Sequence, residues 1–132
     1  LSLETLDRVR KVAKATGMLD DPVFRDKLAK AEIDVMAQSA MFAQVVEMTQ
    51  AGMDIGDGSS FIKIVSTETM QKICDLLLES AGDRGAESGP IETEDGPVDV
   101  AIHWLEARRM SIFAGTSEIQ RNVTAKRVLG LP

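Results

Sequence analysis

The sequence is poor in the side chains that build metal and disulfide sites. It has one cysteine, one histidine and no tyrosine, and aromatic residues make up only 4% of its 132 residues. The single thiol, Cys74, excludes an internal disulfide and a zinc site of paired cysteines, and it suits a reducing compartment. It lies in the apolar segment KICDLLL, which indicates a buried and inert thiol. A lone His103 among scattered acidic residues predicts no metal site.

Long apolar runs and basic stretches are also missing. No apolar run approaches the roughly 18 residues that a membrane-spanning helix needs. The first residues, LSLETLDRVRK, do not show the charged-then-apolar pattern of a secretion signal, so we expect a cytoplasmic protein. They also lack an initiator methionine, which indicates a fragment or a processed chain. The net charge is −6 and there is no basic stripe, which argues against nucleic-acid binding.

The residues that are abundant favour helices. Ala, Met, Leu, Glu and Lys dominate, whereas strands prefer aromatic and β-branched residues. Apolar residues recur at helical spacing in five segments, which we expect to be helices at about 3–16, 22–52, 60–82, 99–111 and 116–129. Gly17 suits a helix end, and Asp21 and Pro22 suit a helix start. The pattern predicts one all-α bundle over residues 1–132.

Two segments depart from this pattern. The segment GMDIGDGSS (52–60) is expected to be a plain connector. Residues 83–99 hold six acidic residues and one basic residue, with little apolar content, which predicts a mobile acidic loop at 84–98. The stretch from Met36 to Met48, in contrast, is apolar almost all round its helix. Such a helix needs covering on several sides, so we expect a homodimer or homotetramer that forms through the bundle.

The C-terminal segment 112–132, IFAGTSEIQRNVTAKRVLGLP, closely resembles the C-terminus of the acyl-CoA dehydrogenase family. That family typically reads aromatic-x-G-T-S-[EQ]-I-Q-R there, followed by A-[KR]-x-L-G. The spacing of Ser117 and Gln120 alone also fits a capping box at the start of an ordinary helix. The segment TGMLDDPVFRDKLAKAEID is similar to a bacterial branch of the same family. The matching positions are Phe113, Gly115, Thr116, Ser117, Glu118, Ile119, Gln120, Arg121, Ala125, Leu129 and Gly130.

The resemblance implies a fold and an activity. Family members have a helical domain, a β-domain and a C-terminal up-down helical bundle, and this chain would be that bundle alone, the C-terminal fragment of a larger flavoprotein. They hold FAD between the last two domains and usually form tetramers. They remove the α-proton of an acyl-CoA thioester and pass the β-hydride to the flavin, in fatty acid metabolism. Electrons then usually leave through an electron-transfer flavoprotein. The chain by itself is expected to be inactive.

The resemblance also implies site residues. Thr116, Ser117 and Glu118 correspond to family positions that contact FAD, and they open a helix whose free N–H groups can meet cofactor oxygens. Phe113, Ala114 and Gly115 would lie next to the substrate, and Gly115 permits a tight turn beside a flat ligand. Many family members have their catalytic glutamate where this sequence has Ala114. Alanine cannot take a proton, so no catalytic residue is assigned within the chain.

The sequence is therefore compatible with three hypotheses for the function of the chain. In the first, the chain belongs to an active dehydrogenase whose carboxylate base lies on an earlier helix, upstream of Leu1. In the second, it belongs to a non-catalytic, dehydrogenase-like scaffold subunit that is kept for assembly. The third is an unrelated helical interaction domain.

Overall fold

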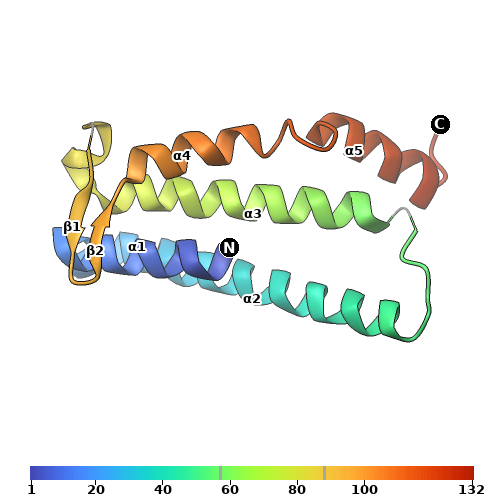
Figure 1. Cartoon of the computed structure of the whole chain (residues 1–132), viewed down its shortest axis with the longest axis horizontal. Helices are drawn as coiled ribbons and strands as arrows, with labels where there is room; N and C mark the ends of the chain where they lie inside the picture. The colour runs from blue at the N-terminus through green and yellow to red at the C-terminus, as the bar shows by residue number, and fades with distance from the viewer. Residues whose placement is uncertain (57, 88) are drawn as a thin grey trace.

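A computed structural model describes residues 1–56, 58–87 and 89–132. Asp57 of the expected connector and Ser88 of the expected mobile loop lie outside the described residues. Three helices, α1 (Ser2–Thr16), α2 (Pro22–Gln50) and α3 (Gly58–Ser80), run in alternating directions. Two shorter ones, α4 (Val100–Arg109) and α5 (Ser117–Val123), return along α3 (Figure 1). The predicted all-α, up-down bundle is confirmed, and α3 is its central helix.

The boundary between α1 and α2 follows from the residues at 17–22. Gly17 adopts a left-handed φ of 80°, and its N–H bonds the carbonyl of Lys14, which ends α1. A 3₁₀ turn over Met18–Asp20 leads to Asp21, whose carboxylate accepts a 2.9 Å hydrogen bond from the N–H of Val23. Pro22 occupies the first helical position, so the predicted helix start is confirmed.

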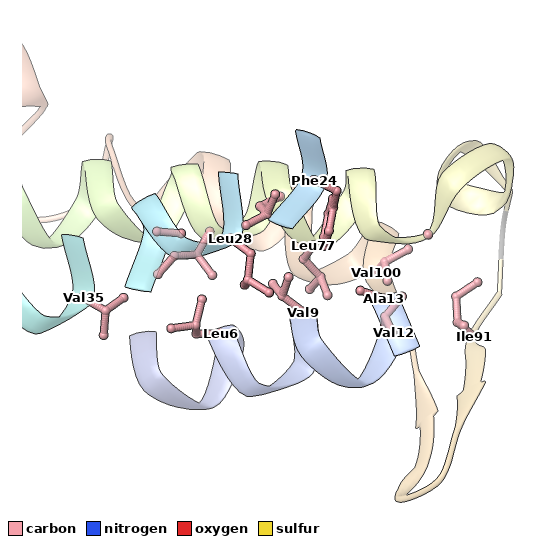
Figure 2. Close-up of a cluster of buried hydrophobic side chains, with 14 residues drawn as sticks. Leu6, Val9, Val12, Ala13, Phe24, Leu28, Val35, Leu77, Ile91 and Val100 are labelled. Atoms are coloured by element: carbon pink, nitrogen blue, oxygen red, sulfur yellow. The ribbon is translucent and has the colours of Figure 1, made fainter. Parts of the chain in front are cut away.

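The main core lies at the end of the bundle where α1, α2 and α3 meet (Figure 2). Apolar side chains from these three helices point toward one another, because each helix presents a stripe at three- and four-residue spacing. Full burial of such a side chain contributes about 1.5–3 kcal/mol of stability. The largest fully buried apolar side chains are Phe24, Ile73, Leu77, Ile91, Val9, Val12, Val35 and Val100.

A β-hairpin occupies part of the acidic segment 84–98. Strands β1 (Ile91–Thr93) and β2 (Gly96–Val98) pair antiparallel, with Ile91 opposite Val98. The sequence pattern predicts no regular structure here, because the segment holds so few apolar residues. One of them, Ile91, is only 2% exposed and joins the main core, and this burial holds the hairpin against α1. The mobility of the segment stays a prediction.

Two lysines of α1 attach the hairpin tip to the bundle. Lys14 forms an ion pair with Glu94, and Lys11 bridges Asp95 at 2.7 Å and Asp7 at 2.6 Å. The hydrogen bonds that Lys11 donates to the two aspartates raise its pKa above the usual range. The acidic charge of the segment is therefore partly neutralised by the neighbouring helix.

The other end of the bundle is less covered, because α1 spans only about half the length of α2 (Figure 1). Met36, Phe42 and Val46 of α2 are exposed there. A groove of about 510 Å³ runs between α2, α3 and the C-terminal segment. Its apolar lining comes from Met41, Val45, Met48, Ile55, Phe61, Ile62, Val128 and Leu129. The apolar stretch 36–48 thus keeps much of its surface open, as an interface would require.

Candidate functional site

The resemblance motif forms a tight turn between α4 and α5. Ala114 has φ 54° and Gly115 has φ 86°, so two successive residues adopt the left-handed conformation. Ala114 is the only non-glycine residue with positive φ in the described part of the chain. The φ of Gly115 lies in the region that favours glycine, and a Cβ there would also come within 2.7 Å of the amide nitrogen at the flexible end of Gln120. The tight turn expected at Gly115 is present.

Hydrogen bonds from two directions hold this turn. The amide of Gln120 donates to the carbonyl of Ala114 at 2.8 Å, from inside α5. The ammonium of Lys63, on α3, donates to the carbonyl of Gly115 at 2.9 Å. Neither contact could be predicted from the sequence. Their geometry depends on how α3 lies against the turn, and no local pattern marks Lys63 as a partner of a residue 52 positions away.

The start of α5 differs from the sequence prediction. Thr116, with φ −63° and ψ 159°, is the N-cap, and its hydroxyl accepts a hydrogen bond from the N–H of Ile119. Ser117 is instead the first helical residue and is buried. The predicted capping box of Ser117 with Gln120 is therefore wrong. Gln120 reaches back to the carbonyl of Ala114, because the left-handed turn directs that carbonyl toward α5.

Glu118 is exposed in the first turn of α5. Its own backbone N–H and the Thr116 hydroxyl hydrogen-bond the carboxylate and lower its pKa below the usual range. The positive charges of Arg121 and Lys63 act in the same direction. At neutral pH Glu118 is therefore an ionised hydrogen-bond acceptor at the surface.

Phe113 is exposed beside the turn, and the guanidinium of Arg109 lies 5.3 Å from the centre of its ring. A cleft of about 390 Å³ runs from Phe113 along α4 to α1 and α3. His103 and Cys74 line it. Cys74 is buried, as expected, and burial raises its pKa to about 11, which keeps the thiol protonated. The structure thus brings Phe113, Ala114 and Gly115 together at one surface with Thr116 and Glu118, while Ser117 between them is buried.

No three His, Cys, Asp or Glu side chains come together as a metal site among residues 1–56, 58–87 and 89–132. In the same ranges, no helix combines the length and apolar character needed to span a bilayer.

The fold places the chain in the class of antiparallel helical-bundle domains, with a glycine-containing turn before a final helix that a threonine caps. The chain belongs to the acyl-CoA dehydrogenase family: residues 3–129 match the family model described as "Acyl-CoA dehydrogenase, C-terminal domain". The resemblance seen in the C-terminal motif is thereby confirmed.

The chain is also similar to individual proteins and solved structures. The chain is 29% identical over 123 residues to "Acyl-CoA dehydrogenase IpdE1" of Mycolicibacterium smegmatis, covering 92% of this chain and 29% of that protein. The structure titled "Tcur3481-Tcur3483 steroid ACAD" matches with a TM-score of 0.80 at 20% identity, over 99% of this chain and 34% of that one. The ChsE4-ChsE5 complex from Mycobacterium tuberculosis gives a TM-score of 0.74 at 19% identity, over 97% and 35%. The chain therefore spans about a third of the length of such relatives.

Proposed function

We propose that this chain is the C-terminal domain of an FAD-dependent acyl-CoA dehydrogenase that introduces an α,β double bond into an acyl-CoA thioester. The observation that carries the proposal is the turn Phe113–Glu118. Its residues other than Ala114 match the family motif, and all of them except the buried Ser117 are at least partly exposed. Because the chain is only a third of its relatives' length, the reaction belongs to a longer protein.

The residues of the turn fit FAD, the cofactor that accepts the hydride of the β-carbon when bound. Within the described ranges, no hydrogen bond satisfies the N–H groups of Ala114, Gly115 and Thr116. Glu118 adds an ionised acceptor. Donors and an acceptor side by side suit the oxygens, hydroxyls and ring nitrogens of a dinucleotide. We assign Thr116, Ser117 and Glu118 to the cofactor, and Phe113, Ala114 and Gly115 to the neighbourhood of the substrate.

The proton acceptor of the proposed reaction does not come from position 114, since a methyl group carries no lone pair. We place it on a carboxylate outside these 132 residues, on an earlier helix. Electrons would then pass to an electron-transfer flavoprotein. The proposed compartment is the cytoplasm.

Assembly through the bundle forms part of the proposal. The exposed Met36, Phe42 and Val46, together with the apolar groove beside them, supply a surface that a second subunit would remove from water. We propose a homodimer or homotetramer formed through this face.

A second candidate is a dehydrogenase-like scaffold subunit without a base of its own. Ala114 favours it, and the titles of the two structures described above each name two proteins, which one title describes as a complex. In that case the catalytic carboxylate would lie on a different subunit.

The test uses the full-length protein that contains this domain. We expect it to purify with bound flavin and to reduce an artificial electron acceptor when given a saturated acyl-CoA. Glu118→Ala should weaken flavin binding about tenfold, the loss typical of one hydrogen bond to a charged group. Asn122→Ala, an exposed change on the same helix, is the control. Absence of flavin overturns the proposal, and bound flavin without turnover supports the scaffold subunit.

A further inference from the structure

Lys63 differs from the other described lysine of α3 in what it contacts. Lys72 is exposed and forms an ion pair with Asp34. Lys63 is half-buried, and its ammonium donates to the carbonyl of Gly115 at 2.9 Å. Among the described residues, Lys63 forms no ion pair with an Asp or Glu. An ammonium group that is half-buried and donates to a single backbone carbonyl indicates that the position of this carbonyl matters.

The carbonyl in question belongs to a turn that needs external support. Alanine is less stable at φ 54° than in the right-handed region. Glycine, here at φ 86°, can adopt many other backbone conformations. Gln120 holds the carbonyl of Ala114, and Lys63 holds the next one along the chain. Side chains from two different helices, α5 and α3, thereby hold two successive peptide planes of the turn.

Fixing the carbonyls also fixes the N–H groups. All peptide bonds here are trans, so the C=O and N–H of one plane point in opposite directions. The N–H groups of Gly115 and Thr116 therefore point away from Gln120 and Lys63 respectively. These are two of the N–H groups that no partner within the described chain satisfies.

We propose that Lys63 is a positioning residue: its ammonium, bonded to the Gly115 carbonyl, holds the turn Phe113–Thr116 so that its free N–H groups face the flavin. This inference rests on the proposed function of the turn. In this proposal Lys63 acts through the carbonyl of Gly115.

The experiment compares variants of the full-length protein with its flavin. Lys63→Met removes the ammonium and keeps the apolar stem, and Lys63→Arg keeps a charged donor. Lys72→Met is the matched control on the same helix. Lys63→Gln, one atom shorter than lysine, replaces Lys63→Met if that variant does not fold. Three quantities are measured: the flavin dissociation constant, the thermal unfolding midpoint, and deuterium uptake over residues 111–118. This last segment contains the Ser117 N–H, which bonds the Ser111 carbonyl at 3.1 Å and closes the turn.

We expect Lys63→Met to weaken flavin binding about tenfold. It should also speed deuterium uptake over 111–118, with an unfolding midpoint equal to that of Lys72→Met. Lys63→Arg should restore both properties. The inference is overturned if Lys63→Met binds flavin like Lys72→Met, or if Lys63→Arg is as defective as Lys63→Met. If the unsubstituted protein holds no flavin, the proposed function itself fails, and the inference fails with it.

Discussion

The indole N–H of Trp104, on α4, donates to Oδ1 of Asp75, on α3, at 2.7 Å. Arg108 donates to the same oxygen at 2.8 Å, and its guanidinium lies 4.7 Å from the centre of the Trp104 ring. Gln71 completes the contact by donating to the carbonyl of Ala107 at the end of α4. One carboxylate therefore organises the packing of α4 on α3, the helix pair that leads into the turn.

Replacement of Asp75 should loosen α4. We expect Asp75→Ala to lower the free energy of unfolding by about 1 kcal/mol. The loss is no larger because Asp75 and Arg108 are partly exposed and because the indole N–H of Trp104 can hydrogen-bond water instead. Asp34→Ala removes a single exposed ion pair with Lys72 and should cost less than about 0.5 kcal/mol. Denaturant unfolding followed through Trp104, the only tryptophan, measures both. Equal effects would show that Asp75 has no special role.

Ile91 should hold the acidic segment in place. We expect Ile91→Ala to destabilise the fold by about 2 kcal/mol, the low end for a buried isoleucine, because its site at the core edge can partly collapse. Hydrogen exchange over residues 89–98 should become faster than in the unsubstituted chain. The same measurement on the unsubstituted chain tests the predicted mobility of 84–98. Full protection there would contradict it.

The single histidine allows a clean titration. Burial of His103, followed by the positive charge of Arg8, lowers its pKa below the ordinary 6.5. The neutral form is favoured in the folded state, so this contribution to stability is complete above pH 6.5. It is lost as the pH falls from there through the folded-state pKa. NMR titration of the imidazole should give a midpoint below 6.5, and Arg8→Met should raise it. A midpoint above 6.5 would show that His103 is not desolvated.

Position 114 can be tested by adding the missing carboxylate. Ala114 already has φ 54°, so a longer unbranched side chain adds little backbone strain. In the full-length protein we remove the upstream base and then introduce Ala114→Glu. We expect recovery of part of the roughly 10²–10⁴-fold that a general base contributes. The assay is acceptor reduction with a saturated acyl-CoA. If activity stays absent while flavin content is unchanged, position 114 does not face the substrate.

The exposed apolar face of α2 should mediate assembly. Phe42→Glu places a charge within the stretch 36–48, and we expect it to shift sedimentation toward the monomer at tens of micromolar. Val23→Glu adds the same charge to an exposed position in the first turn of α2 and is the control. A clean monomer before any substitution would refute the proposed interface.

Local features of the fold could be predicted from the sequence. Helix periodicity, the left-handed Gly17 and the Asp21-Pro22 start each depend on a few neighbouring residues, and the structure confirms them. The hairpin at 91–98 could not be predicted in this way. Its stability depends on Ile91 entering a core that is built by helices far away in the sequence.

The candidate site also has features that could be predicted from the sequence and others that could not. The order of residues from Phe113 to Gly130 was enough to suggest the family and to indicate a turn at Gly115. The cap on Thr116 instead of Ser117, the left-handed Ala114 and the contact from Lys63 emerged only in three dimensions. The sequence by itself determines which residues can form helices and turns, because these choices are governed by neighbours along the chain. Tertiary structure decides which distant donor meets which carbonyl, because that requires α3 to be packed beside the turn.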